Sequence, residues 1–214
     1  MRCDKKQMLL YAVTDRAWTG ERTLLQQVEL ALKGGVTCVQ LREKKLDRAQ
    51  FLAEAMDMAA LCRDYGVPLI INDDVDIALA CHADGVHVGQ SDMQASLVRK
   101  RAGEKLMIGV SAHSVEEAVA AVRNGADYLG VGAMFATSTK TDTHVLPRET
   151  LRDICNAVEV PVVAIGGIHK ENISFLKGTG ADGVALVSAI FGAKDIEREC
   201  RTLRELSREM VEAK

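Results

Sequence analysis

The chain lacks the features that mark membrane, secreted or nucleic-acid-binding proteins. No apolar run reaches the roughly 20 residues that a membrane-spanning helix needs. The N-terminal MRCDKKQM is not followed by an apolar stretch of signal-peptide length. The net charge is only −3, so the charge balance points to neither nucleic acid nor a membrane surface as a partner. We therefore expect a cytoplasmic protein, and the sequence leaves open whether it forms a homo-oligomer.

Paired cysteines are also absent. The chain has six cysteines, but none forms a CxxC pair and none has the spacing of a metal site. Several lie within or beside apolar runs, where a thiol behaves as a small apolar side chain. We expect reduced, mostly buried thiols, as is usual for cytoplasmic proteins.

What the sequence does contain is an alternation of short apolar runs with longer amphipathic segments, repeated eight times. The apolar runs are rich in Val, Ile and Leu with little alternation, which predicts strands buried on both faces, as in a parallel sheet. We expect a single α/β domain over 1–214 that folds as a (β/α)8 TIM barrel with eight helices. An open doubly wound sheet is the alternative, but its Gly-rich first turn is missing from VTDRAWTGERT. The expected strands are 8–15, 36–43, 67–72, 84–89, 106–111, 127–132, 160–166 and 182–188.

Helix signals fit between these runs. The segment from Glu21 has apolar residues at helical spacing and ends in a Gly pair. Asp47 is a candidate N-cap for the helix over 47–65. Ser114, with Glu117 three residues later, predicts a capping box.

A faint internal repeat supports the barrel. CHADGVHVG, NGADYLGVG and TGADGVALV share an Ala-Asp step that enters a strand, and GGVTCVQL resembles a decayed fourth copy. The copies fall on alternate strands, which is what a barrel assembled from doubled βα units would retain.

An unusual cluster of charge follows the buried run in VPLIINDDVD. Asn72, Asp73 and Asp74 follow one expected strand and Asp92 follows the next, so Asp73 and Asp92 can approach each other. Adjacent carboxylates repel unless a cation or a helix start compensates them. Two carboxylates beside an amide suit a Mg²⁺–diphosphate site. The alternative is helix capping alone, with Asp74 or Asp76 as the cap.

Cations follow the expected strand at 36–43. Alternation places Gln40, Arg42 and Lys44 on one side, where an amide and two cations would suit a diphosphate or a carboxylate. The alternative is a solvated, charged strand end.

Three further strand ends carry polar residues. Ser111 can donate to a phosphate, whereas His113 has no partner that the sequence reveals and is either an acid–base group or a hydrogen-bonded structural residue. The hydroxyl-rich loop 137–142, with Lys140, can wrap an anion or be a plain polar loop. Gly166, Gly167 and the segment around Ser188 lie where barrels commonly bind phosphate.

The ordered set of motifs resembles one family, the thiamine phosphate synthases. The resemblance spans nearly the whole chain, and the motifs are specific together although each is weak alone. They are YAVTDR (11–16), VQLREK (39–44), INDDVDIAL (71–79), DGVHVGQSD (84–92), IGVSAHS (108–114), DYLGVGAMFATSTK (127–140), VVAIGGI (162–168) and DGVALVSAI (182–190).

The resemblance implies that an aminopyrimidine bearing a diphosphomethyl group is joined to a thiazole phosphate, giving thiamine phosphate and pyrophosphate. It implies Mg²⁺ as cofactor, with Asp73 and Asp92 as ligands. Catalytic roles fall to Arg42, Lys44, Ser111 and Lys140, because fixed cations and donors stabilise the charge on the leaving diphosphate. The pyrimidine diphosphate site comprises Gln40, Arg42, Lys44, Asn72, Ser111 and Lys140, and the thiazole phosphate site comprises Thr137, Ser138, Thr139, Gly167, Val187 and Ser188.

One departure from the family pattern and several competing functions remain. The segment Ala133-Met134-Phe135-Ala136 lacks the prolines expected there, which should loosen the loop over 133–142.

A thiazole tautomerase of the same fold would make no use of the paired carboxylates. A noncatalytic phosphate-binding barrel would bind without turnover. A Schiff-base aldolase would need a Lys within a strand, whereas the Lys residues here fall at strand ends and in loops.

Overall fold

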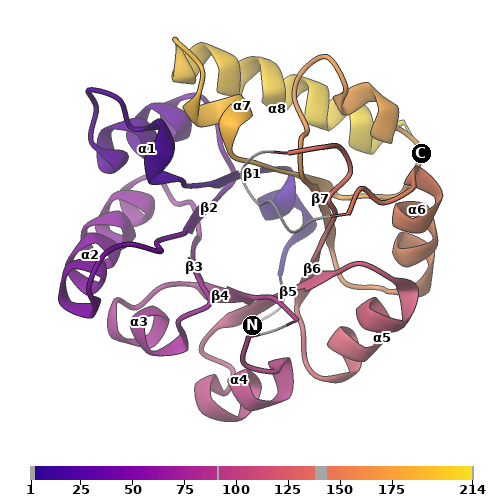
Figure 1. Ribbon diagram of the computed structural model, residues 1–214, viewed down its shortest axis with the longest axis horizontal. Helices are drawn as coiled ribbons and strands as arrows, with labels where there is room; N and C mark the ends of the chain where they lie inside the picture. The colour runs from indigo at the N-terminus through magenta and orange to yellow at the C-terminus, as the bar shows by residue number, and fades with distance from the viewer. Residues whose placement is uncertain (1–2, 91, 138–143, 214) are drawn as a thin grey trace.

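Eight parallel strands close into a barrel in the computed structural model, which describes residues 3–90, 92–137 and 144–213 (Figure 1). Each strand pairs with its neighbours in chain order, and β1 pairs with β8 to close the ring. The predicted TIM barrel is therefore confirmed. Every expected strand overlaps one observed strand and contains it in full except at 106–111, where the observed strand runs one residue further, to Ala112. The strands are β1 (Leu10–Val13), β2 (Cys38–Leu41), β3 (Leu69–Asn72), β4 (Gly85–Val88), β5 (Met107–Ala112), β6 (Tyr128–Val131), β7 (Val162–Ile165) and β8 (Gly183–Leu186).

The strands are buried on both faces, as the apolar runs predicted. Alternate side chains point inward and outward. Along β1, Tyr11 and Val13 belong to the small cluster inside the barrel, whereas Leu10 and Ala12 belong to the larger layer between strands and helices. The barrel therefore has two cores, and the inner one forms the floor beneath the carboxyl ends of the strands.

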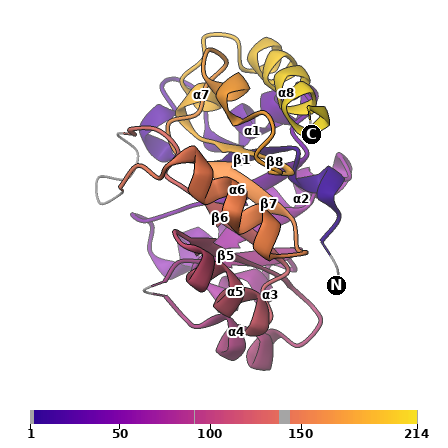
Figure 2. The ribbon, with the colours of Figure 1, turned by 90° about the vertical axis from the view of Figure 1, so that its right-hand side faces the viewer.

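The helices form the outer layer (Figure 2). The described residues contain the expected eight α-helices, but two of them follow β8, and only a 3-10 turn, η3 (Ile173–Leu176), connects β7 to β8. Gly178 and Gly180 follow that turn with positive φ angles, which end it before a longer helix can form. The helices are α1 (Leu24–Lys33), α2 (Arg48–Asp64), α3 (Val75–Ala80), α4 (Ala95–Ala102), α5 (Val115–Arg123), α6 (Arg148–Ala157), α7 (Ser188–Phe191) and α8 (Ile196–Glu212), with further 3-10 turns η1 (Lys5–Met8) and η2 (Arg16–Trp18).

Helix starts follow the capping signals with one difference. Asp47 accepts a hydrogen bond from the Gln50 N–H at 2.9 Å and caps α2 as predicted. Ser114 caps α5 by accepting from the Glu117 N–H. The predicted capping box was wrong in its second half, because the Glu117 carboxylate bonds the N–H of His113 instead of that of Ser114. Within the described part of the chain, the helices are too short or too polar to span a membrane.

The internal repeat corresponds to a repeated clamp between strands. Asp127, just before β6, accepts a hydrogen bond from the Ile108 N–H at 2.8 Å and donates its own N–H to the Ile108 carbonyl at 2.7 Å. Each even strand is thereby fixed against the odd strand before it. The same reciprocal pairing joins Asp84 to Leu69, Asp182 to Val162 and, with a hydroxyl in place of the carboxylate, Thr37 to Leu10.

Candidate active site

A cavity of about 350 Å³ opens at the carboxyl ends of the strands. Its wall contains every predicted site residue that the structure describes, although these come from seven different strand ends. They are Gln40, Arg42, Lys44, Asn72, Asp73, Asp92, Ser111, Thr137, Gly167, Val187 and Ser188.

Three predicted residues, Ser138, Thr139 and Lys140, lie outside the described residues, as does most of the expected anion-binding loop. The part of that loop that is described is fixed to β7. Met134 donates its N–H to the Ile165 carbonyl at 2.9 Å and Phe135 donates to the Gly166 carbonyl at 3.0 Å. These two bonds hold Thr137 close to the cavity mouth.

The end of β2 is held by the residues that follow β1. Thr14 is fully buried, and its hydroxyl accepts a hydrogen bond from the Arg42 N–H at 2.9 Å. The Arg42 guanidinium then lies 3.5 Å from an Asp15 carboxylate oxygen. The motifs YAVTDR and VQLREK, 23 residues apart in the sequence, therefore form one unit that orients the first cation of the cavity.

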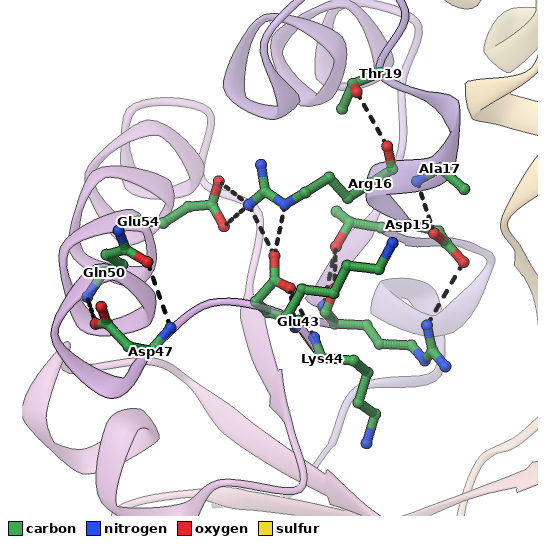
Figure 3. Close-up of polar contacts among 12 residues, drawn as sticks. Asp15, Arg16, Ala17, Thr19, Glu43, Lys44, Asp47, Gln50 and Glu54 are labelled. Atoms are coloured by element: carbon green, nitrogen blue, oxygen red, sulfur yellow. Dashed lines mark hydrogen bonds and ion pairs between the residues drawn. The ribbon is translucent and has the colours of Figure 1, made fainter.

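Arg16 supports the same strand end from behind, between Glu43 and Glu54 (Figure 3). Its guanidinium lies 2.8 Å from Glu43 and 2.7 Å from Glu54. Burial would raise the pKa of Glu43, but hydrogen bonds from the Lys45 backbone and from Arg16 outweigh it, and the pKa is lowered. Glu43 is therefore a charged, fixed anchor for the turn that carries Lys44.

Asp73 occupies an uncommon backbone conformation at the end of β3. Its φ angle is +64°, in the left-handed region that few residues other than glycine adopt. Its carboxylate lies 2.6 Å from the Lys44 ammonium. Burial raises the pKa of Asp73 and the nearby Asp92 carboxylate adds to this effect, whereas Lys44 opposes it. The predicted approach of Asp73 to Asp92 is therefore present.

The donor set around Asp73 and Asp92 fits a hard divalent cation. The described residues contain no cluster of three or more His, Cys, Asp or Glu side chains that could hold a metal. Mg²⁺, however, is usually bound by one or two carboxylates, with water and substrate phosphate completing its six ligands. Burial and then the second carboxylate raise the pKa of Asp73, and a bound cation would relieve both effects.

The other two carboxylates of the charged run are structural. Asp74 accepts a hydrogen bond from the Ile77 N–H at 2.9 Å and caps α3. Asp76 lies in the first turn of that helix and pairs with Arg101 at 2.5 Å. Capping therefore accounts for Asp74 but not for Asp73.

The cavity floor holds aromatic residues that sequence reasoning missed. Tyr11, His87 and Tyr128 all line the cavity, and both tyrosines are buried. Burial raises the pKa of both tyrosine hydroxyls well above the usual value. The sequence does contain a signal for them. Tyr11, His87 and Tyr128 each interrupt an apolar run, at one of the alternate positions whose side chains point into the barrel.

His113 is exposed and has a partner that the sequence did not reveal. Its ring Nδ1 lies 3.0 Å from a carboxylate oxygen of Glu117, one helical turn later. The residue also lines the cavity mouth. The structure therefore supports the hydrogen-bonded alternative for this histidine.

Glycines after β7 serve close packing. Gly166 and Gly167 have φ angles of +97° and +63°. A methyl group at Gly167 would overlap the Ala136 carbonyl and the Phe135 side chain. After the neighbouring strand β8, the short helix α7 begins at Ser188, which also lines the cavity. The two segments therefore form one continuous part of the cavity wall.

Comparisons with known proteins agree with this arrangement. The family model described as thiamine monophosphate synthase matches residues 10–190. Thiamine-phosphate synthase of Clostridium acetobutylicum is 49% identical over 197 residues, covering 92% of this chain and 93% of that protein. The Ruminiclostridium cellulolyticum enzyme of the same name is 52% identical over 197 residues, covering 92% and 94%.

A solved structure shows the same fold at high similarity. Thiamine phosphate pyrophosphorylase from Pyrococcus furiosus superposes with a TM-score of 0.89 at 38% identity, covering 97% of this chain and 98% of that one. This chain belongs to the thiamine monophosphate synthase family.

Proposed function

We propose that this protein is a thiamine-phosphate synthase, which joins 4-amino-2-methyl-5-(diphosphomethyl)pyrimidine to 4-methyl-5-(2-phosphoethyl)thiazole and releases pyrophosphate. One observation carries the proposal beyond family membership. A single cavity has Arg42, Lys44, Asp73 and Asp92 on one side and the Gly167 and Ser188 segments on the other. The first side suits a metal-bound diphosphate and the second a monophosphate.

The cationic side stabilises the leaving group. As the bond from the pyrimidine methylene carbon to the diphosphate oxygen breaks, negative charge grows on the diphosphate. Arg42 and Lys44, held by Asp15 and Asp73, lie in the cavity wall where they can bind that charge. Asn72 and Ser111 supply amide and hydroxyl donors, and Lys140 is assigned to the same site from the sequence motif alone.

A Mg²⁺ ion held by Asp73 and Asp92 would neutralise part of the diphosphate charge. The Lys44 ammonium can shift from Asp73 to the diphosphate when that substrate binds. No strong base is required, because the thiazole nitrogen that attacks the methylene carbon has no proton to lose. Thr137, Gly167, Val187 and Ser188 would hold the thiazole phosphate, together with Ser138 and Thr139.

Pyrophosphate release from the pyrimidine diphosphate tests the proposal. Release that requires both the thiazole phosphate and Mg²⁺, with thiamine phosphate formed in equal amount, is the expected result. Asp92→Ala should remove most of this activity and leave the fold intact, because Asp92 lies beside Asp73. No release from the folded protein would overturn the proposal and favour a noncatalytic barrel, and interconversion of thiazole tautomers would favour the tautomerase.

We also propose that the protein works in the cytoplasm on small-molecule substrates. None of the six cysteines, all of them described, forms a disulfide, and burial raises the pKa of Cys62 and Cys200 to about 12. Reduced thiols of this kind are typical of a reducing compartment.

A further inference from the structure

A chain of hydrogen bonds crosses the floor of the cavity. Gln40 Nε2 lies 2.9 Å from the Tyr11 hydroxyl, which lies 2.8 Å from the Tyr128 hydroxyl. Tyr128 lies 3.1 Å from His87 Nδ1, and His87 Nε2 lies 3.0 Å from the Ser111 hydroxyl. Five side chains from strands β2, β1, β6, β4 and β5 are thereby joined in one line.

The barrel makes room for this line. A methyl group at Gly109 would overlap the Tyr128 ring and hydroxyl and would come against His87 Nδ1. One at Gly130 would lie 3.1 Å from the His87 ring. Strands β5 and β6 therefore have glycine at the two positions where a larger residue would collide with Tyr128 and His87. The sequence of the barrel is thus compatible with this line of side chains and with few alternatives to it.

The direction of the chain follows from its first member. A carboxamide nitrogen can only donate, so Tyr11 accepts from Gln40 and its own hydrogen is available for Tyr128. Tyr128 then donates to Nδ1 of His87, which leaves the hydrogen of the neutral imidazole on Nε2. Both phenols keep their hydrogens at neutral pH, because burial raises their pKa values well above the usual range.

The last bond decides what Ser111 can do. Nε2–H of His87 donates to the Ser111 hydroxyl, so Ser111 accepts within the protein and its own hydrogen is free for another acceptor. Ser111 lines the cavity, where the proposed ligand carries anionic oxygens. If the hydrogen bonds ran in the opposite direction, the Ser111 hydroxyl would donate its hydrogen to His87. Only its lone pairs would then face the anionic ligand, which they would repel.

We propose that Tyr11, Tyr128 and His87 are positioning residues that act through a one-directional hydrogen-bond chain and keep the Ser111 hydroxyl as a donor to bound substrate. The contact between Ser111 and substrate rests on the proposed function, whereas the placement of the hydrogens does not. We expect the hydrogen-bond chain to strengthen substrate binding by about as much as one hydrogen bond does, because it orients the Ser111 donor and adds no charge.

The first test reads the hydrogens directly. Side-chain nitrogen NMR of the full-length protein with isotope-labelled histidine should show His87 as a neutral ring protonated at Nε2, its signals being assigned by their loss in His87→Gln. Protonation at Nδ1 alone would overturn the proposal, whether or not the protein proves to be a synthase. In Tyr128→Phe the preference for Nε2 should weaken, because Nδ1 loses its donor.

The second test reads the reaction. Tyr128→Phe and Tyr11→Phe should each lower kcat/KM for the pyrimidine diphosphate by about 10-fold, measured at a temperature where circular dichroism shows the variant to be folded. Tyr65→Phe is the matched control, because the third tyrosine of the chain lies near the surface with its hydroxyl 3.5 Å from Glu29. The control should retain wild-type kinetics.

A double-mutant cycle separates positioning from general packing. In a Ser111→Ala background, Tyr128→Phe should cause little further loss, because its effect passes through the Ser111 hydroxyl. Equal losses in both backgrounds would overturn the proposal, as would wild-type kinetics in Tyr128→Phe. An inactive wild type with an Nε2-protonated His87 would instead count against the proposed function alone.

Discussion

Lys44 Nζ lies 2.6 Å from Asp73 Oδ2, although the two residues are 29 positions apart in the sequence. The pair joins the ends of neighbouring strands β2 and β3 at the cavity mouth. Asp73 also faces Asp92, so one cation is shared with two carboxylates in a partly buried site. Burial and Asp92 keep the pKa of Asp73 raised in spite of Lys44, so a further cation would be favourable there.

The first prediction concerns pH. Because the folded-state pKa of Asp73 is raised, the folded protein binds this proton more tightly, and the associated stability is lost as pH rises through the folded-state pKa. Asp73→Asn removes that loss, and Asn tolerates the positive φ angle well. In urea unfolding without divalent cations, the stability of the variant relative to wild type should therefore increase from low to neutral pH. A pH-independent difference would contradict the assigned shift.

The second prediction concerns the metal. Mg²⁺ should stabilise the wild type and raise its melting temperature. At 100 times its dissociation constant, the expected gain in unfolding free energy is about 2.7 kcal/mol. Asp73→Asn and Asp92→Asn should abolish this gain. Asp76→Asn is the control, because Asp76 belongs to the same acidic run but pairs with Arg101 away from the cavity. Loss of the Mg²⁺ effect in Asp76→Asn as well would indicate nonspecific screening.

The third prediction concerns the repeated strand clamp. Asp127→Ala leaves the buried Ile108 N–H without its carboxylate partner and removes the ion pair with Arg99, so it should cost about 2–3 kcal/mol of unfolding free energy. Asp127→Asn keeps an oxygen that can accept from Ile108 and should cost less. Urea unfolding measures both. The kcat of the folded variants should stay near that of the wild type, because the clamp lies at the opposite end of β5 and β6 from Ser111.

The fourth prediction separates backbone strain from packing at Gly167. Gly66 has nearly the same φ angle, +65° against +63°, but open space where a methyl group would go. Gly66→Ala should therefore cost about 1 kcal/mol from the backbone alone. Gly167→Ala should cost more and should raise KM for the thiazole phosphate, because the 135–136 segment must move. Equal costs in thermal unfolding would show that this segment yields freely.

Much of this protein follows from local sequence patterns. Short apolar runs predicted all eight strands because burial on both faces leaves no room for polar alternation. The Ala-Asp repeat predicted a doubled unit, and Asp47 and Ser114 predicted helix starts, because each of these signals acts over a few residues. Period-two alternation also placed Gln40, Arg42 and Lys44 on one side of a strand, and all three line the cavity.

Other features depend on residues far apart in the sequence, and only the tertiary structure decided them. The sequence left Asp74 and Asp76 as alternative caps of α3, and the structure decides for Asp74, because the cap is set by where the chain turns after β3. It gave no role to Arg16, which acts on Glu43 and Glu54 from other elements. The line from Gln40 to Ser111 exists only once the barrel closes, because hydrogen bonds between strands need distances that no local pattern encodes.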